Sequence, residues 1–381
     1  MTLSLSGDRI HVSYAICGAE KEALGMARDI CIEQTVEFPE DLIKRADIRK
    51  QIFGNLKRFY LLEKNRYIAD IDYPIEAAGN ELTQLLNVLF GNISLKPGIK
   101  LLEFELPPSL SKAYRGPRFG RSGLRALLNI SSRPLLCTAL KPMGLAPLEL
   151  AESAHRFALG GIDLIKDDHG LANQSFCGFQ ERVNRVGEAV RSANELSNNR
   201  TLYLPNVTAN ADEIMSRAEL AKNAGAGGIV ISPGLVGFDA MRAIADNDAL
   251  ALPVFCHPAL LGSFTVSPKS GISHGALYGT INRLAGADAC IFPSFGGRFT
   301  FSKDQCRKIA SCTEAPLGKL RSIFPVPAGG MRLDTLPQLM EFYGRDVILL
   351  IGGDLHRQGD DLVASCADFL RIVESLSASI E

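Results

Sequence analysis

The first hundred residues mix two hydrophobic periods. Extended or alternating runs near IHVSYAI and RFYLLEKNRYIADIDYP are interspersed with the helical patterns KEALGMARDICIEQ and ELTQLLNVLFG. Strands repeat their side-chain direction every two residues and helices every 3.6 residues, so the two patterns predict different elements. A mixture of both within one segment predicts an α+β domain.

The pattern changes after a stretch rich in proline, glycine and basic residues, PPSLSKAYRGPRFGRSG, which we interpret as a crossing between domains. From there on, short apolar runs alternate with helical patterns such as PLELAESAHRFALG and FQERVNRVGEAVRSANELS. The apolar runs are eight in number: PLLCTAL, IDLIKDD, TLYLPNV, GGIVISP, LPVFCHP, DACIFPS, SIFPVPAGG and VILLIGG. Eight successive βα units predict a (β/α)₈ TIM barrel.

The expected architecture is therefore α/β in two parts. We predict an N-terminal α+β domain of the ferredoxin-like type over residues 1–125 and a catalytic (β/α)₈ barrel over residues 126–381. A length of 381 residues agrees with two domains, since about 150 residues per domain is usual.

Composition narrows the class of partner and compartment. The chain carries 41 basic and 42 acidic residues, so no overall field attracts nucleic acid or an anionic membrane. The nine cysteines are scattered, without a C-x-x-C pair, which predicts reduced thiols. The first residues lack the apolar run of a secretory signal, and no later segment approaches 18 uninterrupted apolar residues. We expect a soluble, cytoplasmic protein.

The stretch GGIDLIKDDHG at 160–170 places several charged groups at the end of a buried strand. With a side-chain period of two, Lys166 and Asp168 share one face of this strand and Asp167 points the other way. Three interpretations are open at this point. The two groups form a salt bridge, or Lys166 forms a Schiff base with a carbonyl substrate, or Lys166 is carbamylated and binds a divalent cation with Asp168.

Polar residues and glycines also follow other predicted strands. Lys141 follows the first, Asn206 the third and His257 the fifth, while the glycine pairs 329–330 and 352–353 follow the seventh and eighth. In a (β/α)₈ barrel these ends converge on one mouth, where the chemistry takes place. The main-chain N–H groups of Gly329, Gly330, Gly352 and Gly353 are expected to bind one phosphate.

These motifs carry a family resemblance. GGIDLIKDDHG resembles the metal-site motif G-G-x-D-x-x-K-D-D-E of the ribulose-bisphosphate carboxylase (RuBisCO) large-chain family. LKPMG at 140–144 resembles its K-P-K segment, GN at 91–92 its N-terminal asparagine, and IEQTVEF at 32–38 its glutamate-bearing segment. Residues 255–299 resemble RuBisCO-like proteins more closely than true carboxylases.

The resemblance implies a site built by two subunits of a head-to-tail homodimer, or of a higher multiple of dimers. It implies that Lys166 is carbamylated and binds Mg²⁺ with Asp168, and that Lys141 and His257 are catalytic. Further residues are implied to complete the site: Glu33 and Asn92 from the partner subunit, and Asn206 and Arg298 as substrate contacts.

Departures from the family pattern narrow the function. The glutamate after D-D is His169 here, and further changes bring in Met143, Pro258, Ile291 and Ala328. Such changes argue against bisphosphate binding and CO₂ fixation, so we expect a RuBisCO-like protein that acts on a monophosphate. Mg²⁺ prefers oxygen ligands. His169 therefore binds a more nitrogen-tolerant ion such as Mn²⁺, performs acid–base catalysis, or only caps the next helix or faces solvent.

Three functions follow, from different classes. The expected one is C–C bond cleavage in a keto sugar-acid monophosphate of the 3-oxo-isoapionate 4-phosphate type, by a metal-dependent decarboxylase or carboxyl-transferring hydrolase that forms an enediolate. The alternative enzyme is an enolase or isomerase of a ketose phosphate such as a methylthio-sugar phosphate. The third is a non-catalytic, regulatory protein that binds phosphate esters.

Overall fold

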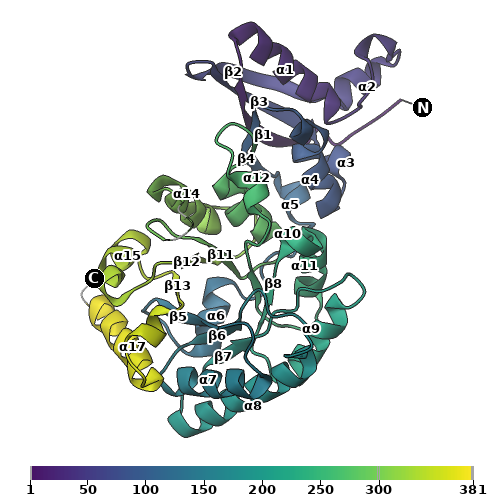
Figure 1. Ribbon diagram of the computed structural model, residues 1–381. Helices are drawn as coiled ribbons and strands as arrows, with labels where there is room; N and C mark the ends of the chain where they lie inside the picture. The colour runs from purple at the N-terminus through teal and green to yellow at the C-terminus, as the bar shows by residue number, and fades with distance from the viewer. Residues whose placement is uncertain (1, 298, 300, 379–381) are drawn as a thin grey trace.

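The computed structural model describes residues 2–297, 299 and 301–378. The chain forms two sheets: a five-stranded sheet in the N-terminal part and an eight-stranded barrel in the C-terminal part. Figure 1 shows the N-terminal sheet standing above the barrel, with α12 (Gly262–Thr265) between them. This arrangement confirms the predicted fold class.

The N-terminal sheet has the strand order β10-β4-β1-β3-β2. Its pairs are antiparallel except β10 with β4. The strands are β1 (Arg9–Cys17), β2 (Asn55–Glu63), β3 (Arg66–Pro74), β4 (Ile99–Glu105) and β10 (Gly271–Ile272). The helices of this part are α1 (Glu20–Glu33), η1 (Glu40–Leu42), α2 (Ala46–Gln51), α3 (Ile75–Ala78), α4 (Leu82–Phe90) and η2 (Asn92–Leu95).

The barrel strands are parallel and run in the order β7-β6-β5-β13-β12-β11-β9-β8. Main-chain hydrogen bonds between residues 205–207 and Val230 close the gap between β7 and β8. All eight predicted apolar runs form these strands: β5 (Leu135–Leu140), β6 (Leu164–Asp167), β7 (Leu202–Leu204), β8 (Ile229–Ile231), β9 (Val254–Cys256), β11 (Ala289–Pro293), β12 (Phe324–Ala328) and β13 (Ile348–Ile351).

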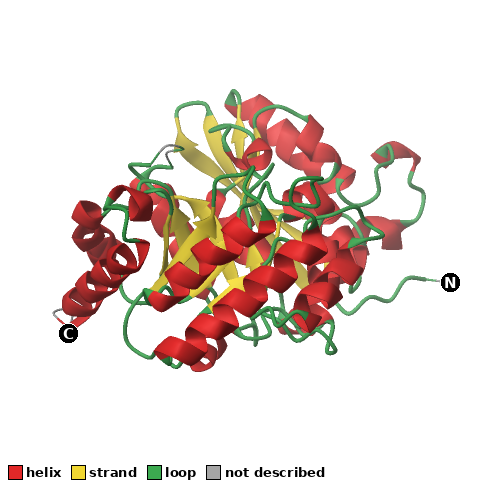
Figure 2. Ribbon diagram, turned by 60° about the horizontal axis from the view of Figure 1, so that its bottom comes forward, coloured by secondary structure: helices red, strands yellow, loops and turns green. Residues whose placement is uncertain are grey.

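Helices cover the outside of the barrel, as Figure 2 shows. Two of them follow the helical patterns quoted from the sequence: α7 (Pro147–Leu159) and α8 (Phe179–Ser197). The next along the chain is α9 (Ile214–Asn223). The others are α5 (Pro108–Ser111), α6 (Gly120–Leu128), α10 (Pro233–Val236), α11 (Phe238–Asp246), the π-helix η3 (Gly275–Ile281), α13 (Asn282–Leu284), α14 (Lys303–Glu314), η4 (Leu333–Thr335), α15 (Leu336–Tyr343), α16 (Asp354–Arg357) and α17 (Leu362–Ala378).

Alternate strand residues fill the barrel with their side chains. The interior cluster contains Leu164, Phe255 and Ile291, and it includes Leu124 and Leu128 of α6. This helix forms within the segment expected to be a crossing between domains, because its apolar face packs against the lower end of the barrel. The predicted boundary between residues 125 and 126 falls inside α6 and stays a prediction.

One barrel loop leaves the barrel. After β9 the chain climbs to the N-terminal sheet, where β10 pairs with β4 in the register Gly271 to Lys100 and Ile272 to Leu101. Gly271 has φ +97°, and an added Cβ would lie 2.1 Å from the carbonyl oxygen of Phe264. Only glycine accommodates both this backbone conformation and this close approach. The loop is therefore shared by both sheets.

Two expectations from composition can be compared with the fold. All nine cysteines are free thiols. Across the described residues, no helix combines the length and the apolar character needed to cross a membrane.

Candidate functional site

A lysine and an aspartate from neighbouring strands meet at the barrel mouth. Lys141 directly follows β5, and its Nζ forms an ion pair with Oδ2 of Asp168, which follows β6. The other oxygen, Oδ1, accepts a hydrogen bond from the main-chain N–H of Gly170 at 3.0 Å. Burial raises the pKa of Asp168, but hydrogen bonds from Lys141 and Gly170 outweigh this effect, so the net pKa lies below the ordinary value. Asp168 is therefore an anion at neutral pH.

Lys166 lies deeper in the mouth than Lys141. It is buried, and its Nζ donates a hydrogen bond to the main-chain oxygen of Asp167 at 2.8 Å. Burial lowers the pKa of Lys166 below the ordinary value, and nearby Lys141 adds to this, while Cys137 and Asp168 oppose it. A lowered pKa makes the neutral amine, which is the form that reacts with CO₂ or a carbonyl, more accessible than in a surface lysine.

Asp167 points away from the mouth, as the strand period predicts. Its carboxylate accepts hydrogen bonds from Nε of Arg182 (3.1 Å), the hydroxyl of Tyr203 (2.8 Å) and the main-chain N–H of Asn206 (3.0 Å). Arg182 and Asp167 are both completely buried. A paired and fully hydrogen-bonded buried charge gives a fixed geometry. This network therefore holds the end of β6, and with it Lys166 and Asp168.

Two histidines stack beside these groups. The rings of His169 and His257 lie nearly parallel, with centroids 4.4 Å apart. Burial, reinforced by Lys166 and His169, lowers the pKa of His257 to about 2, and burial also lowers that of His169 below 6.5. Both rings are therefore neutral at pH 7. Because Nδ1 of His257 accepts a hydrogen bond from the main-chain N–H of Ala259 at 3.2 Å, its hydrogen sits on Nε2.

The ring of His169 carries its hydrogen on the opposite nitrogen. Nδ1 of His169 faces Oδ1 of Asp168 at 3.4 Å. An adjacent carboxylate favours the tautomer that carries hydrogen on Nδ1 and leaves Nε2 as a base. The side chain of His169 is 49% exposed, so the ring is open to a substrate. The stacked pair thus offers one basic nitrogen and one N–H donor.

Asn206 braces the loop that carries His169. Its side-chain amide donates to the main-chain oxygens of His169 (3.0 Å) and Leu171 (2.9 Å), and its Oδ1 accepts from the N–H of Thr208 at 3.2 Å. The residue is buried. These contacts use the amide for positioning, whereas the predicted substrate contact of Asn206 stays a prediction.

The two glycine pairs differ in whether backbone conformation and packing require glycine. Gly329 and Gly330 have φ of +87° and +71°, and a Cβ on Gly330 would lie 3.0 Å from Cα of Gly297. At Gly352 and Gly353 neither a positive φ nor packing requires glycine, because an added Cβ meets nothing within 4 Å. The main chain there borders open space, which suits the close approach of an anion. Phosphate binding by either pair stays a prediction.

An apolar cavity of about 530 Å³ opens beside the stacked histidines. Both His169 and His257 line it, as does Gly329. Most of its wall comes from apolar side chains, namely Pro258, Ala259, Leu260, Val266, Tyr278, Ile291, Phe292, Pro293, Phe299, Phe301 and Ala328. We call this cavity the apolar pocket. Ligand sites of this kind combine an apolar wall with a few polar groups.

The contacts can be compared with the expected metal site. Asp168 supplies a carboxylate at this corner, its Oδ2 pairs with Lys141, and His169 offers nitrogen. No group of three or more His, Cys, Asp and Glu side chains within the described ranges is placed to hold a metal ion. Mg²⁺ takes oxygen ligands, so the unmodified side chains do not fit it. A carbamate on Lys166 would add two oxygens beside Asp168; this group, and Mg²⁺ or Mn²⁺ with it, stays a prediction.

Two predicted residues, Glu33 and Asn92, pair with each other in the N-terminal part. Glu33 ends α1 and accepts a hydrogen bond from Nδ2 of Asn92 at 3.2 Å. Figure 1 shows α1 on the side of the N-terminal sheet that faces away from the barrel. Their predicted role in a partner's site stays a prediction. Arg298 lies outside the described residues.

Sequence reasoning did not find the apolar pocket. The departures to Pro258 and Ile291 indicate lost charges, yet they also mark the wall of this cavity. Tyr278 and Leu260 gave no separate signal, because apolar residues in helices and loops are usually core. The loss of two charged residues, together with the apolar segment that follows His257, is the sequence signal that could have indicated this pocket.

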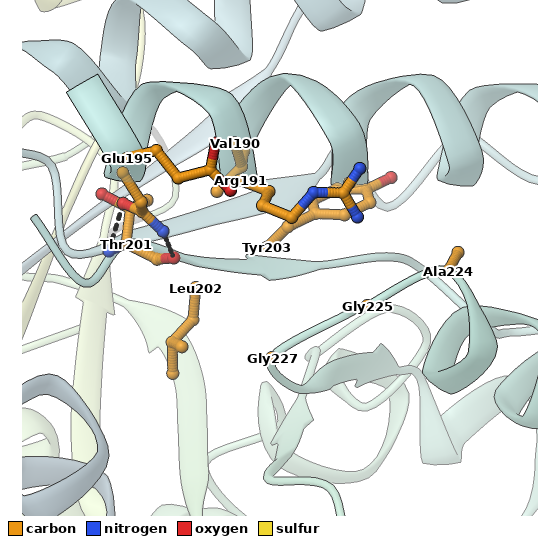
Figure 3. Close-up of a pocket in the computed structure, with 11 residues that line it drawn as sticks. Val190, Arg191, Glu195, Thr201, Leu202, Tyr203, Ala224, Gly225 and Gly227 are labelled. Atoms are coloured by element: carbon orange, nitrogen blue, oxygen red, sulfur yellow. Dashed lines mark hydrogen bonds between the residues drawn. The ribbon is translucent and has the colours of Figure 1, made fainter.

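A second cavity lies at the opposite end of the strands. It measures about 400 Å³ and is lined where β7 begins, at Thr201, and where the turn before β8 passes, at Gly225 and Gly227. Figure 3 shows its hydrogen bonds at Thr201, whose main chain exchanges two with Asn194, each 2.9 Å long. This face of a (β/α)₈ barrel serves stability rather than chemistry, so the apolar pocket is the candidate site.

Comparisons with known proteins agree with this geometry. Residues 120–371 match the family described as ribulose bisphosphate carboxylase large chain, catalytic domain. The chain is 39% identical to ribulose bisphosphate carboxylase-like protein 1 of Rhodopseudomonas palustris over 97% of this chain and 98% of that protein. It is 37% identical to 5-methylthioribulose-1-phosphate isomerase of Rhodospirillum rubrum (96% of each chain) and 30% identical to 2,3-diketo-5-methylthiopentyl-1-phosphate enolase of Bacillus licheniformis (94% and 89%).

Solved structures give the same result. The Rubisco-like protein from Rhodopseudomonas palustris superposes with a TM-score of 0.88 at 39% identity, over 97% of this chain and 99% of that chain. The dimeric archaeal Rubisco from Hyperthermus butylicus has a TM-score of 0.89 at 26% identity, over 100% and 93%. The chain therefore belongs to the ribulose bisphosphate carboxylase large-chain family, among its RuBisCO-like members.

Proposed function

We propose that the protein is an isomerase or enolase of a ketose monophosphate that carries an apolar tail, such as a methylthio-ketose phosphate. The observation that carries this proposal is the apolar pocket directly beside the stacked His169 and His257. A thioether tail gains free energy there by leaving water. The relatives named as an isomerase and an enolase of methylthio-sugar phosphates support the same reading and favour it over C–C bond cleavage.

The chemistry required is movement of a proton next to a carbonyl. We infer that Nε2 of His169 removes the proton, since this ring is neutral and its Nδ1 faces Asp168. The developing enediolate oxygen would accept hydrogen bonds from the ammonium of Lys141 and from Nε2–H of His257. Donors fixed where charge develops lower the barrier. Lys141 gives a proton to the former carbonyl oxygen and takes the proton of the adjacent hydroxyl, while His169 returns its proton to the neighbouring carbon, which completes the isomerisation without breaking a C–C bond.

The substrate phosphate would lie at the other end. Gly329 lines the apolar pocket, and the main chain at Gly352 and Gly353 borders open space. A phosphate bound there and a tail in the apolar pocket would leave the carbonyl between them, next to the histidines. One phosphate site and one apolar site agree with a monophosphate.

The assembly is proposed by analogy. The Rubisco from Hyperthermus butylicus is described as dimeric. In a head-to-tail homodimer, Glu33 and Asn92 of the partner subunit would approach the mouth. We propose this homodimer as the active form.

The test is solvent exchange during turnover. Purified protein is incubated with 5-methylthioribulose 1-phosphate in D₂O, and the products are followed by NMR. We expect an isomeric product with deuterium at the carbon that receives the proton, or exchange into unreacted substrate, and a loss of both in His169→Ala. Release of CO₂ or a carboxylate from 3-oxo-isoapionate 4-phosphate, without exchange into the methylthio substrate, would reject the proposal in favour of C–C cleavage. Binding without turnover would favour the non-catalytic function.

A further inference from the structure

The wall of the apolar pocket is held from behind by the N-terminal sheet. The segment that follows β9 supplies Leu260 and Val266 to this wall and then continues into β10. The end of this segment is anchored on the N-terminal part, where the N–H of Gly98 donates to Oγ of Ser270 at 2.9 Å. The N–H of Ser273 donates to the main-chain oxygen of Leu101 at 2.8 Å. The wall therefore depends on elements outside the barrel.

A buried lysine makes the contact nearest to the pocket. Lys100 of β4 is 6% exposed, and its Nζ donates hydrogen bonds to the main-chain oxygens of Thr265 (3.2 Å) and Ser267 (2.5 Å). These two carbonyls stand on either side of Val266, which is 70% exposed and lines the apolar pocket. Lys100 thus holds the chain on both sides of one pocket residue.

The charge of Lys100 makes this contact costly to replace. No carboxylate within the described ranges forms a salt bridge with Lys100. Burial and the nearby Arg66 lower the pKa of Lys100. A buried cation without a carboxylate must satisfy its hydrogens with other acceptors. A loop that moved would carry its carbonyl oxygens out of hydrogen-bond reach of the ammonium. The Lys100 ammonium and the two carbonyls therefore hold each other in place.

A second contact joins the same turn to the far side of the apolar pocket. The side chain of Thr265 faces the hydroxyl of Tyr278 and lowers its pKa, although burial has the larger effect and raises it. Tyr278 lies in η3, lines the apolar pocket and packs against Phe301, another lining residue, with ring centroids 5.7 Å apart. The turn at Thr265 therefore connects the N-terminal sheet with two walls of the apolar pocket.

We propose that Lys100 is a positioning residue that fixes Val266 in the wall of the apolar pocket and thereby sets the preference for substrates with an apolar tail. This inference rests on the proposed function. It assigns part of the substrate specificity to a residue of the N-terminal sheet that does not touch the substrate.

The test compares Lys100→Met with a matched control. Lys308→Met removes an exposed ion pair between α14 and Glu103 of the same strand β4 (3.0 Å), so it also loosens a contact between the two parts but leaves the pocket wall alone. The readout is the ratio of kcat/KM for 5-methylthioribulose 1-phosphate to that for ribulose 1-phosphate, which lacks the apolar tail. We expect Lys100→Met to lower this ratio about fivefold, mainly through KM, and Lys308→Met to leave it unchanged. An equal loss with both substrates, or an unchanged ratio, overturns the proposal.

A double-mutant cycle tests the route through Val266. If Lys100 acts by placing this side chain, then Lys100→Met has no further effect on the ratio once Val266→Ala is present. If the two substitutions instead lower the ratio additively, Lys100 does not act through Val266. Val266 is exposed, so Val266→Ala folds even where Lys100→Met does not, and an unchanged ratio in Val266→Ala alone also rejects the proposal.

Hydrogen exchange separates this inference from the proposed function, because it needs no substrate. The N–H of Val266 donates a hydrogen bond to the main-chain oxygen of Gly262 at 3.0 Å. In Lys100→Met we expect this amide to exchange about tenfold faster than in the wild type or in Lys308→Met. A wild type that converts neither ketose phosphate rejects the proposed function, while unchanged exchange in Lys100→Met rejects the role of Lys100.

Discussion

Replacing Leu260 by asparagine tests the apolar pocket with little risk to folding. Leu260 lines the apolar pocket, and its φ of +66° lies in the left-handed region. Asparagine adopts that region more readily than leucine does. The substitution therefore removes an apolar wall without adding backbone strain, and the free energy of unfolding should not fall.

The magnitude follows from exposure. Burying a whole leucine side chain is worth about 1.5–3 kcal/mol. Leu260 is 56% exposed without substrate, so about half of that value, roughly 1 kcal/mol, becomes available when a tail covers it. Losing roughly 1 kcal/mol lowers kcat/KM about fivefold. This loss applies only to a substrate whose tail reaches the apolar pocket.

The assay compares two substrates in one variant. We expect Leu260→Asn to lower kcat/KM about fivefold for 5-methylthioribulose 1-phosphate and to leave that for ribulose 1-phosphate within about twofold. Leu196→Asn is the matched control, because Leu196 is an exposed leucine of α8 that does not line the apolar pocket. Equal losses with both substrates, or no loss with the methylthio substrate, would refute the assignment of the apolar pocket to the tail.

Four further predictions concern the rest of the site. If neutral His169 is the base, kcat/KM is constant between about pH 7 and 8 and falls about tenfold per unit below its pKa, which lies under 6.5, so a continuous rise through pH 8 would contradict this role. Calorimetry should detect Mg²⁺ binding only in the presence of bicarbonate and not in Lys166→Met; binding in CO₂-free buffer would argue against a carbamate. Arg182→Met should lower the free energy of unfolding in urea by about 3–5 kcal/mol, because it leaves the carboxylate of Asp167 buried and unpaired, and a change below about 1 kcal/mol would contradict this account. Mixing inactive His169→Ala with inactive Asn92→Ala should restore part of the activity if Asn92 serves the partner's site, whereas no recovery after subunit exchange would reject the shared site.

Local patterns were sufficient to predict the barrel. Each of the eight apolar runs is short, is followed by a helical pattern and forms a buried strand, so run length and the alternation with helical patterns identify them. The same rule placed Asp167 opposite Lys166 and Asp168, which the hydrogen bonds of Asp167 confirm. Convergence of strand ends then accounts for the meeting of Lys141 with Asp168 and of His169 with His257.

What the sequence did not predict depends on contacts between distant segments. The strand β10 has two residues and exists only because β4 lies beside it, so no period marks it. The apolar pocket draws on residues from 169 to 329 that meet only in the folded chain. The bracing role of Asn206 and the pairing of Lys100 with two carbonyls involve main-chain acceptors, which any residue type could supply.

The shared position of β10 also limits how members of this family can exchange parts. A chimaera that joins this barrel to another relative's N-terminal half would bring β10 against a foreign β4, and the ammonium that faces the carbonyls of Thr265 and Ser267 would be retained only by chance. Recombination at the apparent joint between the halves would thus disturb ligand choice as well as assembly. In evolutionary terms, the N-terminal half and the lining of the cavity should be inherited as one unit.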